Sequence, residues 1–369
     1  MDAGTPSTRL QVTSHCADLQ EELHFWSVTL GLQLLEIHPA DAPSTAVLEG
    51  HGMRLRLRQG PGPLAPELEL LSDDPRWDPW RQTGWTSPGG ARVRMLPLRP
   101  RVEVPLAVQA TVLTRADDQA NWQVGRAGMR YRDLLPKRHG GAFIASHIRI
   151  VDGGPVPDYV HHHAIRFQLI FCRKGWVRVV YEGQGEPFLM EPGDCVLQPP
   201  HIRHRVLESS AGAEVVEIAS PASHLTQTDA GMTLPSPTLL PPEHLFGGQR
   251  FVRHQGSKGR WQPWRLPGFE AQDTGIADAT QGLAGVRVLR PAHAEARSSR
   301  QQWHDTELCM YYVLQGSLGA RLDGAPLELG VDDCLTLATG QGYEFDRTSG
   351  DLRLLEITLP AAFEVRTSA

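Results

Sequence analysis

Two histidines separated by one residue open the segment with the clearest chemical signal, HHHAIRFQ. Alternate side chains of a β-strand point to the same face, so we expect His161 and His163 to face one interior while His162 points away. Gln168 follows His163 by five residues. Because an odd interval places side chains on opposite faces of a regular strand, we predict a bulge or turn near residues 164–166 that lets Gln168 join the two histidines.

A third histidine, His204, follows the stretch GDCVLQPPHIR. That stretch predicts a strand that ends at paired prolines, with the next strand beginning near His204. Three imidazole nitrogens and one amide oxygen suit a divalent transition metal such as Fe, Mn, Ni, Cu or Zn, with positions left for water or substrate. The sequence therefore predicts one such ion, held by His161, His163, Gln168 and His204.

These side chains are carried by a long series of short strands. From about Asn121 onward, apolar runs alternate with Gly and Pro, which is typical of antiparallel sandwiches and barrels. Two pairs of segments match at a constant offset of 139 residues: GDCVLQPP with DDCLTLAT, and EVVEIASPASH with RLLEITLPAAF. A fixed offset predicts the duplication of one structural unit. The proline-dense residues 235–242 are the expected joint between the two copies.

The spacing of these residues resembles the two motifs of the cupin superfamily. The first motif is matched by His161, His163, Gln168 and Gly175. The second is matched by Gly193, Pro199 and His204, with His201 at a position that is usually Gly. The resemblance implies a mainly β fold: two tandem cupin barrels (double-stranded β-helix, or jelly roll) preceded by a small α+β domain. It assigns residues 121–235 to a metal-binding barrel and 236–369 to a degenerate one.

Gln168 departs from the common cupin pattern, which has Glu at this position. The resemblance therefore points to cupins whose ligands are three His and one Gln, and a proton acceptor must come from another residue. His201 and Glu217 are the candidates, although His201 is equally well explained as an outward turn residue. Arg166 and Cys172 share strand parity with Gln168 and are candidate substrate-binding residues. Arg166 would grip a substrate carboxylate, or would lie in solvent at the barrel rim.

The second copy has lost most of this set. With Gly316 aligned to Gly175, the equivalent positions hold Gln302, His304, Cys309 and Tyr343. His304 is the only ligand-type histidine that remains, and a metal needs several converging donors. We therefore expect no metal in the second barrel, which would be structural or oligomeric, or would bind a ligand without metal.

Residues 1–60 predict a βαβββ unit, with a helix over 17–31 and paired strands over 45–59. This unit resembles one module of the glyoxalase and extradiol-dioxygenase (vicinal oxygen chelate) fold. Gln11 and Glu49 are the residues there that could serve as ligands, so we interpret the module as an accessory or dimerisation domain rather than a second metal site. The Pro- and Trp-rich residues 61–120 are expected to form an irregular connecting segment, because proline interrupts helices and sheets.

Composition restricts the class of function. The 369 residues include 36 basic and 42 acidic side chains, for a net charge of −6, and 40% are hydrophobic. No stretch of 18 apolar residues or basic run appears, so neither membrane nor nucleic acid is an expected partner. The first residues lack the layout of a signal peptide, and the five cysteines form no C-x-x-C pair, so we expect a cytoplasmic protein. A small molecule is the expected ligand, and the resemblance favours a homodimer.

Together these features predict a metal-dependent enzyme that acts on a small oxygenated or carboxylated metabolite. A dioxygenase and an isomerase or lyase both suit a neutral site of three His and one Gln, with a preference for oxygen chemistry. The alternative is a non-catalytic bicupin that binds or senses a metabolite or a metal.

Overall fold

The computed structural model describes residues 8–29, 31–50, 52–62, 67–86, 92–98, 101–118, 122–293, 296–297 and 300–367. By their internal contacts the residues form two compact units. The first comprises residues 1–103, 159–164 and 223–233, and the second comprises 104–158, 165–222 and 234–369. Among the described segments, no helix has both the length and the apolar character needed to cross a membrane.

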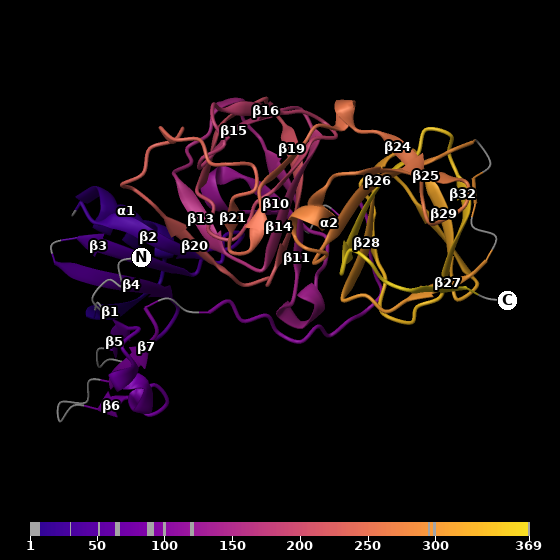
Figure 1. Cartoon of the computed structure of the whole chain (residues 1–369). Helices are drawn as coiled ribbons and strands as arrows, with labels where there is room; N and C mark the ends of the chain where they lie inside the picture. Colours follow the sequence, from indigo (N-terminus) through magenta and orange to yellow (C-terminus); the bar gives the residue numbers. More distant parts are fainter. Residues whose placement is uncertain are drawn as a thin grey trace. The chain divides into compact units, whose positions relative to one another are not determined.

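The first unit begins with the predicted βαβββ order (Figure 1). Its elements are β1 (Thr8–Cys16), α1 (Leu19–His24) with a π-helical turn (Phe25–Thr29), β2 (Gln33–His38), β3 (Thr45–Gly50) and β4 (Met53–Gln59). Asp18 caps α1, because its side chain accepts hydrogen bonds from the backbone N–H groups of Gln20 and Glu21 at 2.7 and 3.1 Å. The strands lie in the order β2-β3-β4-β1, with β1 parallel to β4.

The prediction of an irregular connecting segment is wrong for residues 67–72, 85–86 and 92–96, which form strands. Here β5 (Glu67–Ser72) pairs with β1, β7 (Arg92–Leu96) pairs with β5, and the short β6 (Trp85–Thr86) pairs with β7. Neither β5 nor β7 contains proline, so their N–H groups remain available for pairing. Pro75 and Pro79 lie instead in the 3-10 helix Pro75–Trp80. The side chains of Trp77, Trp80 and Trp85 are not among those that the structure describes.

Two later strands extend the other edge of this sheet. β20 (Leu225–Thr228) pairs with β2, and β13 (His161–Ala164) pairs with β20. The pairing places His163 opposite Thr226, one strand away. The sheet of the first unit therefore includes the strand that carries the first two predicted ligands.

The second unit contains two similar sets of antiparallel strands (Figure 1). The first set is β9 (Trp122–Val124), β10 (Arg130–Asp133), β11 (Ile144–Ile150), β12 (Gly154–Pro155), β14 (Phe167–Lys174), β15 (Val177–Tyr181), β16 (Phe188–Met190), β17 (Cys195–Leu197), β18 (His204–Ser209) and β19 (Ala213–Ser220). Between the sets lie β21 (Leu245–Phe246) and β22 (Gln249–Arg250).

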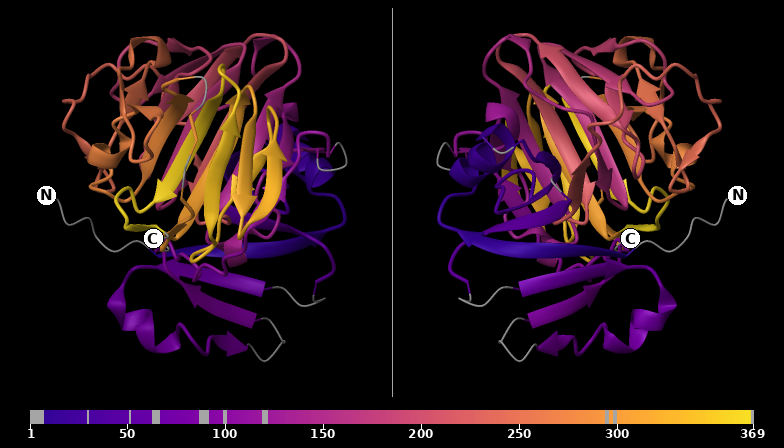
Figure 2. Two further views of the ribbon diagram at one scale, coloured as in Figure 1. Left: turned by 90° about the vertical axis from the view of Figure 1, so that its right-hand side faces the viewer. Right: turned by 90° about the vertical axis from the view of Figure 1, so that its left-hand side faces the viewer.

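The second set begins with β24 (Trp261–Pro263), β25 (Phe269–Asp273), the short helix α2 (Ile276–Ala279) and β26 (Gly285–Pro291). It continues with β27 (Gln302–His304), β28 (Leu308–Gln315), β29 (Leu318–Leu322), β30 (Ala325–Leu329), β31 (Cys334–Thr336), β32 (Tyr343–Thr348), β33 (Arg353–Leu359) and β34 (Val365–Thr367). Figure 2 shows the strands of this second barrel, orange to yellow, running side by side. β17 and β31, like β18 and β32, begin 139 residues apart, which confirms the duplication inferred from the sequence.

Each barrel takes one strand from the segment that precedes the other. β8 (Val112–Thr114), which precedes the first barrel, pairs with β31 of the second. β23 (Val252–His254), which precedes the second barrel, pairs with β17 of the first. The predicted boundaries at 121 and 236 do not anticipate this exchange, because the local pattern of a strand predicts its conformation but not its partner.

A shared core and a buried polar network join the two barrels. One hydrophobic cluster contains Phe167 and Leu169 of the first barrel together with Met310 and Leu355 of the second. Beside it, the buried His147 lies 3.0 Å from Glu214 through Nε2 and 3.2 Å from the Tyr312 hydroxyl through Nδ1. Arg132 donates to the same Nδ1 at 3.2 Å, so Nδ1 accepts and the N–H at Nε2 donates to Glu214.

We predict that Glu214→Gln lowers the free energy of unfolding at pH 7 by about 1.5–3 kcal/mol, because it removes a charged acceptor. Burial alone would raise the pKa of Glu214, but His147 and Arg149 outweigh it and lower the pKa to about 2. The contribution of this carboxylate is therefore present above the ordinary pKa of 4.5 and is lost as the pH falls towards 2. Urea unfolding at several pH values should show the difference between wild type and variant shrinking below pH 4.5. The exposed Glu243→Gln is the control, and an equal loss in that variant would contradict the prediction.

Candidate metal centre

The three predicted histidines converge. His161 and His163 point from the same face of β13, His204 is the first residue of β18, and all three are buried. One ring nitrogen from each lies within 4.8 Å of the other two, so small ring rotations would let a single ion contact all three. The alternation of buried and partly exposed residues along β13 is the pattern expected for a strand with one interior face.

Each of these imidazoles is held through Nδ1. Nδ1 of His161 lies 2.8 Å from the backbone oxygen of Tyr159, and Nδ1 of His204 lies 3.0 Å from that of Ile202. A carbonyl oxygen can only accept, so Nδ1 of both rings carries the proton and Nε2 carries the lone pair. Ligand histidines commonly have this arrangement, because the outer hydrogen bond sets both the tautomer and the ring orientation.

His163 is oriented by a side chain. Its Nδ1 lies 3.0 Å from the hydroxyl of Thr226 on β20, whose side chain is buried. Thr226 has no counterpart among the predicted site residues. Nothing local in the stretch LTQT marks it, since its contact depends on the pairing of β20 with β13.

Gln168 enters from another sheet. β13 ends at Ala164 and β14 begins at Phe167, which confirms the predicted break, but the chain crosses to a second sheet here instead of bulging within one strand. Gln168 is 1% exposed and its amide Nε2 donates to Glu217 on β19 at 2.5 Å. Its Oε1 is buried without a hydrogen-bond partner among the described residues. A metal ligand would satisfy this oxygen, so the donor set fits a divalent ion.

Aromatic rings pack against the histidines. Tyr181 stacks on His204 with ring centroids 5.5 Å apart, and its hydroxyl accepts a hydrogen bond from Gln198 at 2.8 Å. Burial raises the pKa of Tyr181, so it stays a neutral phenol. On the other side, the rings of His163 and His224 lie 5.4 Å apart, edge to face. Neither Tyr181 nor His224 was predicted, and no spacing rule in the sequence singles them out.

The two candidate proton acceptors differ in position. Glu217 touches Gln168, whereas His201 lies on an exposed turn with φ of +66°. That backbone conformation favours glycine, which explains why the motif usually has Gly at this position. Burial and the nearby Arg203 lower the pKa of His201. Of the two residues, Glu217 is the one placed beside a candidate ligand.

The structure does not support the expectation that Arg166 and Cys172 face the cavity. The guanidinium of Arg166 forms two hydrogen bonds with Glu307, at 2.7 and 3.1 Å, so its fork is already occupied by a carboxylate of the protein. Cys172 is fully buried in a hydrophobic cluster, where its thiol donates to the backbone oxygen of Met190 at 3.5 Å. Burial raises the pKa of this thiol to about 12, so it remains protonated. Strand parity alone could not reveal either contact.

The second barrel places different chemistry at the equivalent positions. Gln302 and His304 lie on β27, Cys309 on β28 and Tyr343 at the start of β32. Glu356, which is 139 residues after Glu217, is fully buried and forms an ion pair with the partly exposed Arg265 at 2.5 Å. Burial and the nearby Arg265 lower the pKa of His304 to about 4. The absence of a metal from this barrel remains a prediction.

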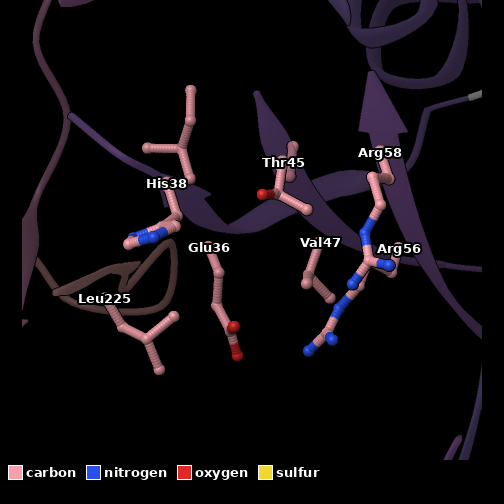
Figure 3. A pocket seen from close by; sticks show the side chains of 9 residues that line it. Glu36, His38, Thr45, Val47, Arg56, Arg58 and Leu225 are labelled. Atoms are coloured by element: carbon pink, nitrogen blue, oxygen red, sulfur yellow. The ribbon is translucent and has the colours of Figure 1, made fainter. Parts of the chain in front are cut away.

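The first unit contains a separate cavity of about 200 Å³ (Figure 3). Arg56 and Arg58 line one side of it and Glu36 lies across from them. Glu36 already pairs with Arg54 at 2.5 Å. Gln11 and Glu49 are the two residues that were considered as ligands in this unit. Gln11 donates a hydrogen bond to Glu69 at 2.6 Å, and Glu49 forms an ion pair with Arg9 at 2.8 Å. Glu36 and Glu49 are therefore each paired with an arginine. The N–H of Gln11 is bound to Glu69, whereas its Oε1 is buried without a hydrogen-bond partner among the described residues.

Comparison with known proteins identifies the fold. No protein-family model matches the chain, and no curated protein matches its sequence. A variant salicylate 1,2-dioxygenase from Pseudoaminobacter salicylatoxidans, solved in complex with gentisate, matches with a TM-score of 0.53 at 14% identity, over 72% of this chain and 88% of that chain.

Another structure of a salicylate 1,2-dioxygenase, from Pseudaminobacter salicylatoxidans, has a TM-score of 0.52 at 12% identity, over 72% of this chain and 90% of that chain. Oxalate decarboxylase from Bacillus subtilis has a TM-score of 0.47 at 14% identity, over 69% of this chain and 78% of that chain. The similarity to the two salicylate 1,2-dioxygenase structures shows that the chain has the bicupin fold, as predicted. The glyoxalase-like resemblance of the N-terminal module is not confirmed by these comparisons and stays a prediction.

We predict that the purified protein retains about one divalent metal ion per chain, and that His161→Ala combined with His204→Ala abolishes it, because two of three imidazole donors are lost. Elemental analysis by mass spectrometry measures the metal. His162→Ala is the matched control, since His162 lies on the same strand with its side chain on the other face. Equal metal content in all three proteins would contradict the site.

We also predict that Thr226→Val weakens metal binding about 10- to 100-fold, because the ring of His163 loses the hydroxyl that orients it. Thr226→Ser retains the hydroxyl and should bind almost as tightly as the wild type. Competition with a chromogenic chelator gives both affinities. The idea fails if the valine and serine variants lose affinity equally.

Proposed function

We propose that this chain is a metal-dependent enzyme that acts on a small oxygenated or carboxylated metabolite, with oxidation by O₂ as the preferred reaction. The observation that carries the proposal is the convergence of three buried imidazoles, each held at Nδ1. Gln168, the fourth residue of the motif, has a buried amide oxygen that lacks a partner among the described residues. Histidines that only fill a hydrophobic core are not expected to share one arrangement, in which Nδ1 of every ring is hydrogen bonded and the rings converge.

The proposed ligands are Nε2 of His161, His163 and His204, with Oε1 of Gln168 as the fourth donor. All four are neutral, so a divalent ion here would keep its full charge and would act as a Lewis acid on a substrate oxygen or, if redox-active, as an activator of O₂. A neutral ligand set also favours an anionic substrate, such as a carboxylate or an ionised phenol or enol.

Glu217 has two roles in this proposal. Its carboxylate accepts the N–H of Gln168 at 2.5 Å, which turns the amide so that Oε1 is left for the metal. Glu217 is also the carboxylate that could take a proton from a bound substrate, because the neutral Gln168 is unable to act as a base. Tyr181, which stacks on His204, is a neutral phenol and adds no charge beside this histidine.

Two features favour oxygen chemistry over isomerisation or elimination. Three neutral imidazoles support a redox-active divalent ion with open positions. In addition, the salicylate 1,2-dioxygenases have the same bicupin fold, and one of them was solved with gentisate. Similarity at 14% identity concerns the fold, so we use these compounds only to choose substrates for the test.

The test measures oxygen consumption by the metal-loaded protein with salicylate, gentisate and a β-diketone. We expect turnover with one of these classes, abolished in the variant that combines His161→Ala and His204→Ala. His162→Ala should keep full activity. Glu217→Gln should lower kcat by about 10²- to 10⁴-fold if Glu217 is the base.

Other outcomes would redirect the proposal. Conversion of a substrate without oxygen uptake would indicate an isomerase or lyase. Ligand-induced thermal stabilisation without any product would overturn the enzyme proposal in favour of a binding or sensing protein.

A further inference from the structure

A cavity of about 360 Å³ in the second barrel is rich in arginine. It lies against β27 and β34, and three of its lining residues are arginines: Arg265, Arg297 and Arg300. Among the described residues that line it, none is Asp or Glu. Guanidinium N–H groups form charge-assisted hydrogen bonds with anions, so an anion in this space would find several donors.

Arg265 is held rigidly at the edge of this cavity. Its guanidinium carbon lies 4.2 Å from the ring centre of Trp264 and 4.8 Å from that of Phe363. Its Nη2 donates both to the buried Glu356 at 2.5 Å and to the hydroxyl of Tyr311 at 3.0 Å. Burial opposes its charge, but Glu356 more than compensates and keeps the pKa of Arg265 above its ordinary value.

The hydrogen bonds to Glu356 and Tyr311 use only part of the Arg265 guanidinium. Both hydrogen bonds use Nη2, and the side chain is still 25% exposed. The planar guanidinium carries five N–H groups, so Nε and Nη1 retain donors for a further acceptor. A pre-oriented guanidinium loses little entropy when it binds a ligand.

Gln302 adds an unpartnered polar group. It is 7% exposed, lines the cavity and makes no side-chain hydrogen bond with any described residue. An amide has both a donor and an acceptor that a bound ligand can use. Leu266 and Val365 form apolar parts of the same lining. The cavity therefore combines cationic donors, one amide and apolar surface.

We propose that this cavity binds a small organic carboxylate without metal. The planar, bidentate geometry of a carboxylate matches that of the guanidinium groups, and the apolar lining suits a carbon skeleton better than it suits an inorganic anion. The second barrel has thus replaced the donors for a cation with donors for an anion. Gln302 stands at the position that His161 occupies in the first barrel, as the sequence alignment of the two copies shows.

The experiment is calorimetric titration of the full-length protein with benzoate, succinate and inorganic phosphate. We expect saturable binding of benzoate or succinate at one site per chain. Benzamide, which has the shape of benzoate without its charge, should bind at least 10-fold more weakly. Tighter binding of phosphate than of both carboxylates, or no binding of either carboxylate at millimolar concentration, would overturn the proposal.

Variants locate the site. The double variant Arg297→Gln with Arg300→Gln should weaken carboxylate binding at least 10-fold. These residues are exposed, so their replacement should leave the fold intact, whereas Arg265→Met would strand the buried Glu356. The matched control is Arg321→Gln with Arg347→Gln, which removes the same charge from other exposed positions of this barrel. Equal weakening in the control would show a general charge effect and would refute the site.

The variant that combines His161→Ala and His204→Ala separates this proposal from the metal centre. Carboxylate binding should persist in it, since the cavity belongs to the other barrel. If binding is lost together with the metal, the carboxylate binds at the metal centre and the cavity proposal is wrong. If the metal is absent from the wild type but the carboxylate still binds, only the proposed enzyme function fails.

Discussion

The geometry of the candidate metal centre depends on one property of imidazole: a neutral ring has a single proton, and the hydrogen bond made by one nitrogen decides what the other nitrogen can do. In His161 and His204 the acceptor for Nδ1 is a backbone oxygen two residues earlier in the chain. The backbone of the two strands therefore sets the tautomer as well as the position of each ring. Only His163 depends on a side chain, Thr226, which is supplied by a neighbouring strand.

The two barrels have a carboxylate at equivalent positions, but the group that binds this carboxylate differs between them. In the first, the carboxylate of Glu217 accepts a hydrogen bond from the amide of Gln168. In the second, the carboxylate at the equivalent position, Glu356, holds the guanidinium of Arg265. Both carboxylates are hydrogen bonded, but Glu217 binds a neutral amide and the fully buried Glu356 binds a guanidinium. Under the proposed function, the first barrel would hold a metal ion, whereas the second already contains the cation of Arg265.

The exchanged strands explain why the barrels form one compact unit. β8 and β23 each complete the sheet of the barrel that they do not precede, and a shared hydrophobic cluster lies between the sheets. The buried contact of His147 with Tyr312 adds a polar link between the barrels. Because all three features join the same sheets, we infer that neither barrel would fold normally alone, and that the degenerate barrel supports the first even without binding a ligand.

The sequence by itself determined the features that depend on short-range geometry. The spacing of His161 and His163 places them on one strand face, the odd interval to Gln168 requires a break, and the 139-residue offset reveals the duplication. Tertiary structure alone decided which strands pair and which distant side chains meet. Thr226 beside His163, Glu307 on Arg166, and the pairing of β8 with β31 join residues far apart in the chain. A local pattern specifies the face to which a side chain points, whereas its partner depends on how the whole chain closes, and neighbouring residues do not encode that closure.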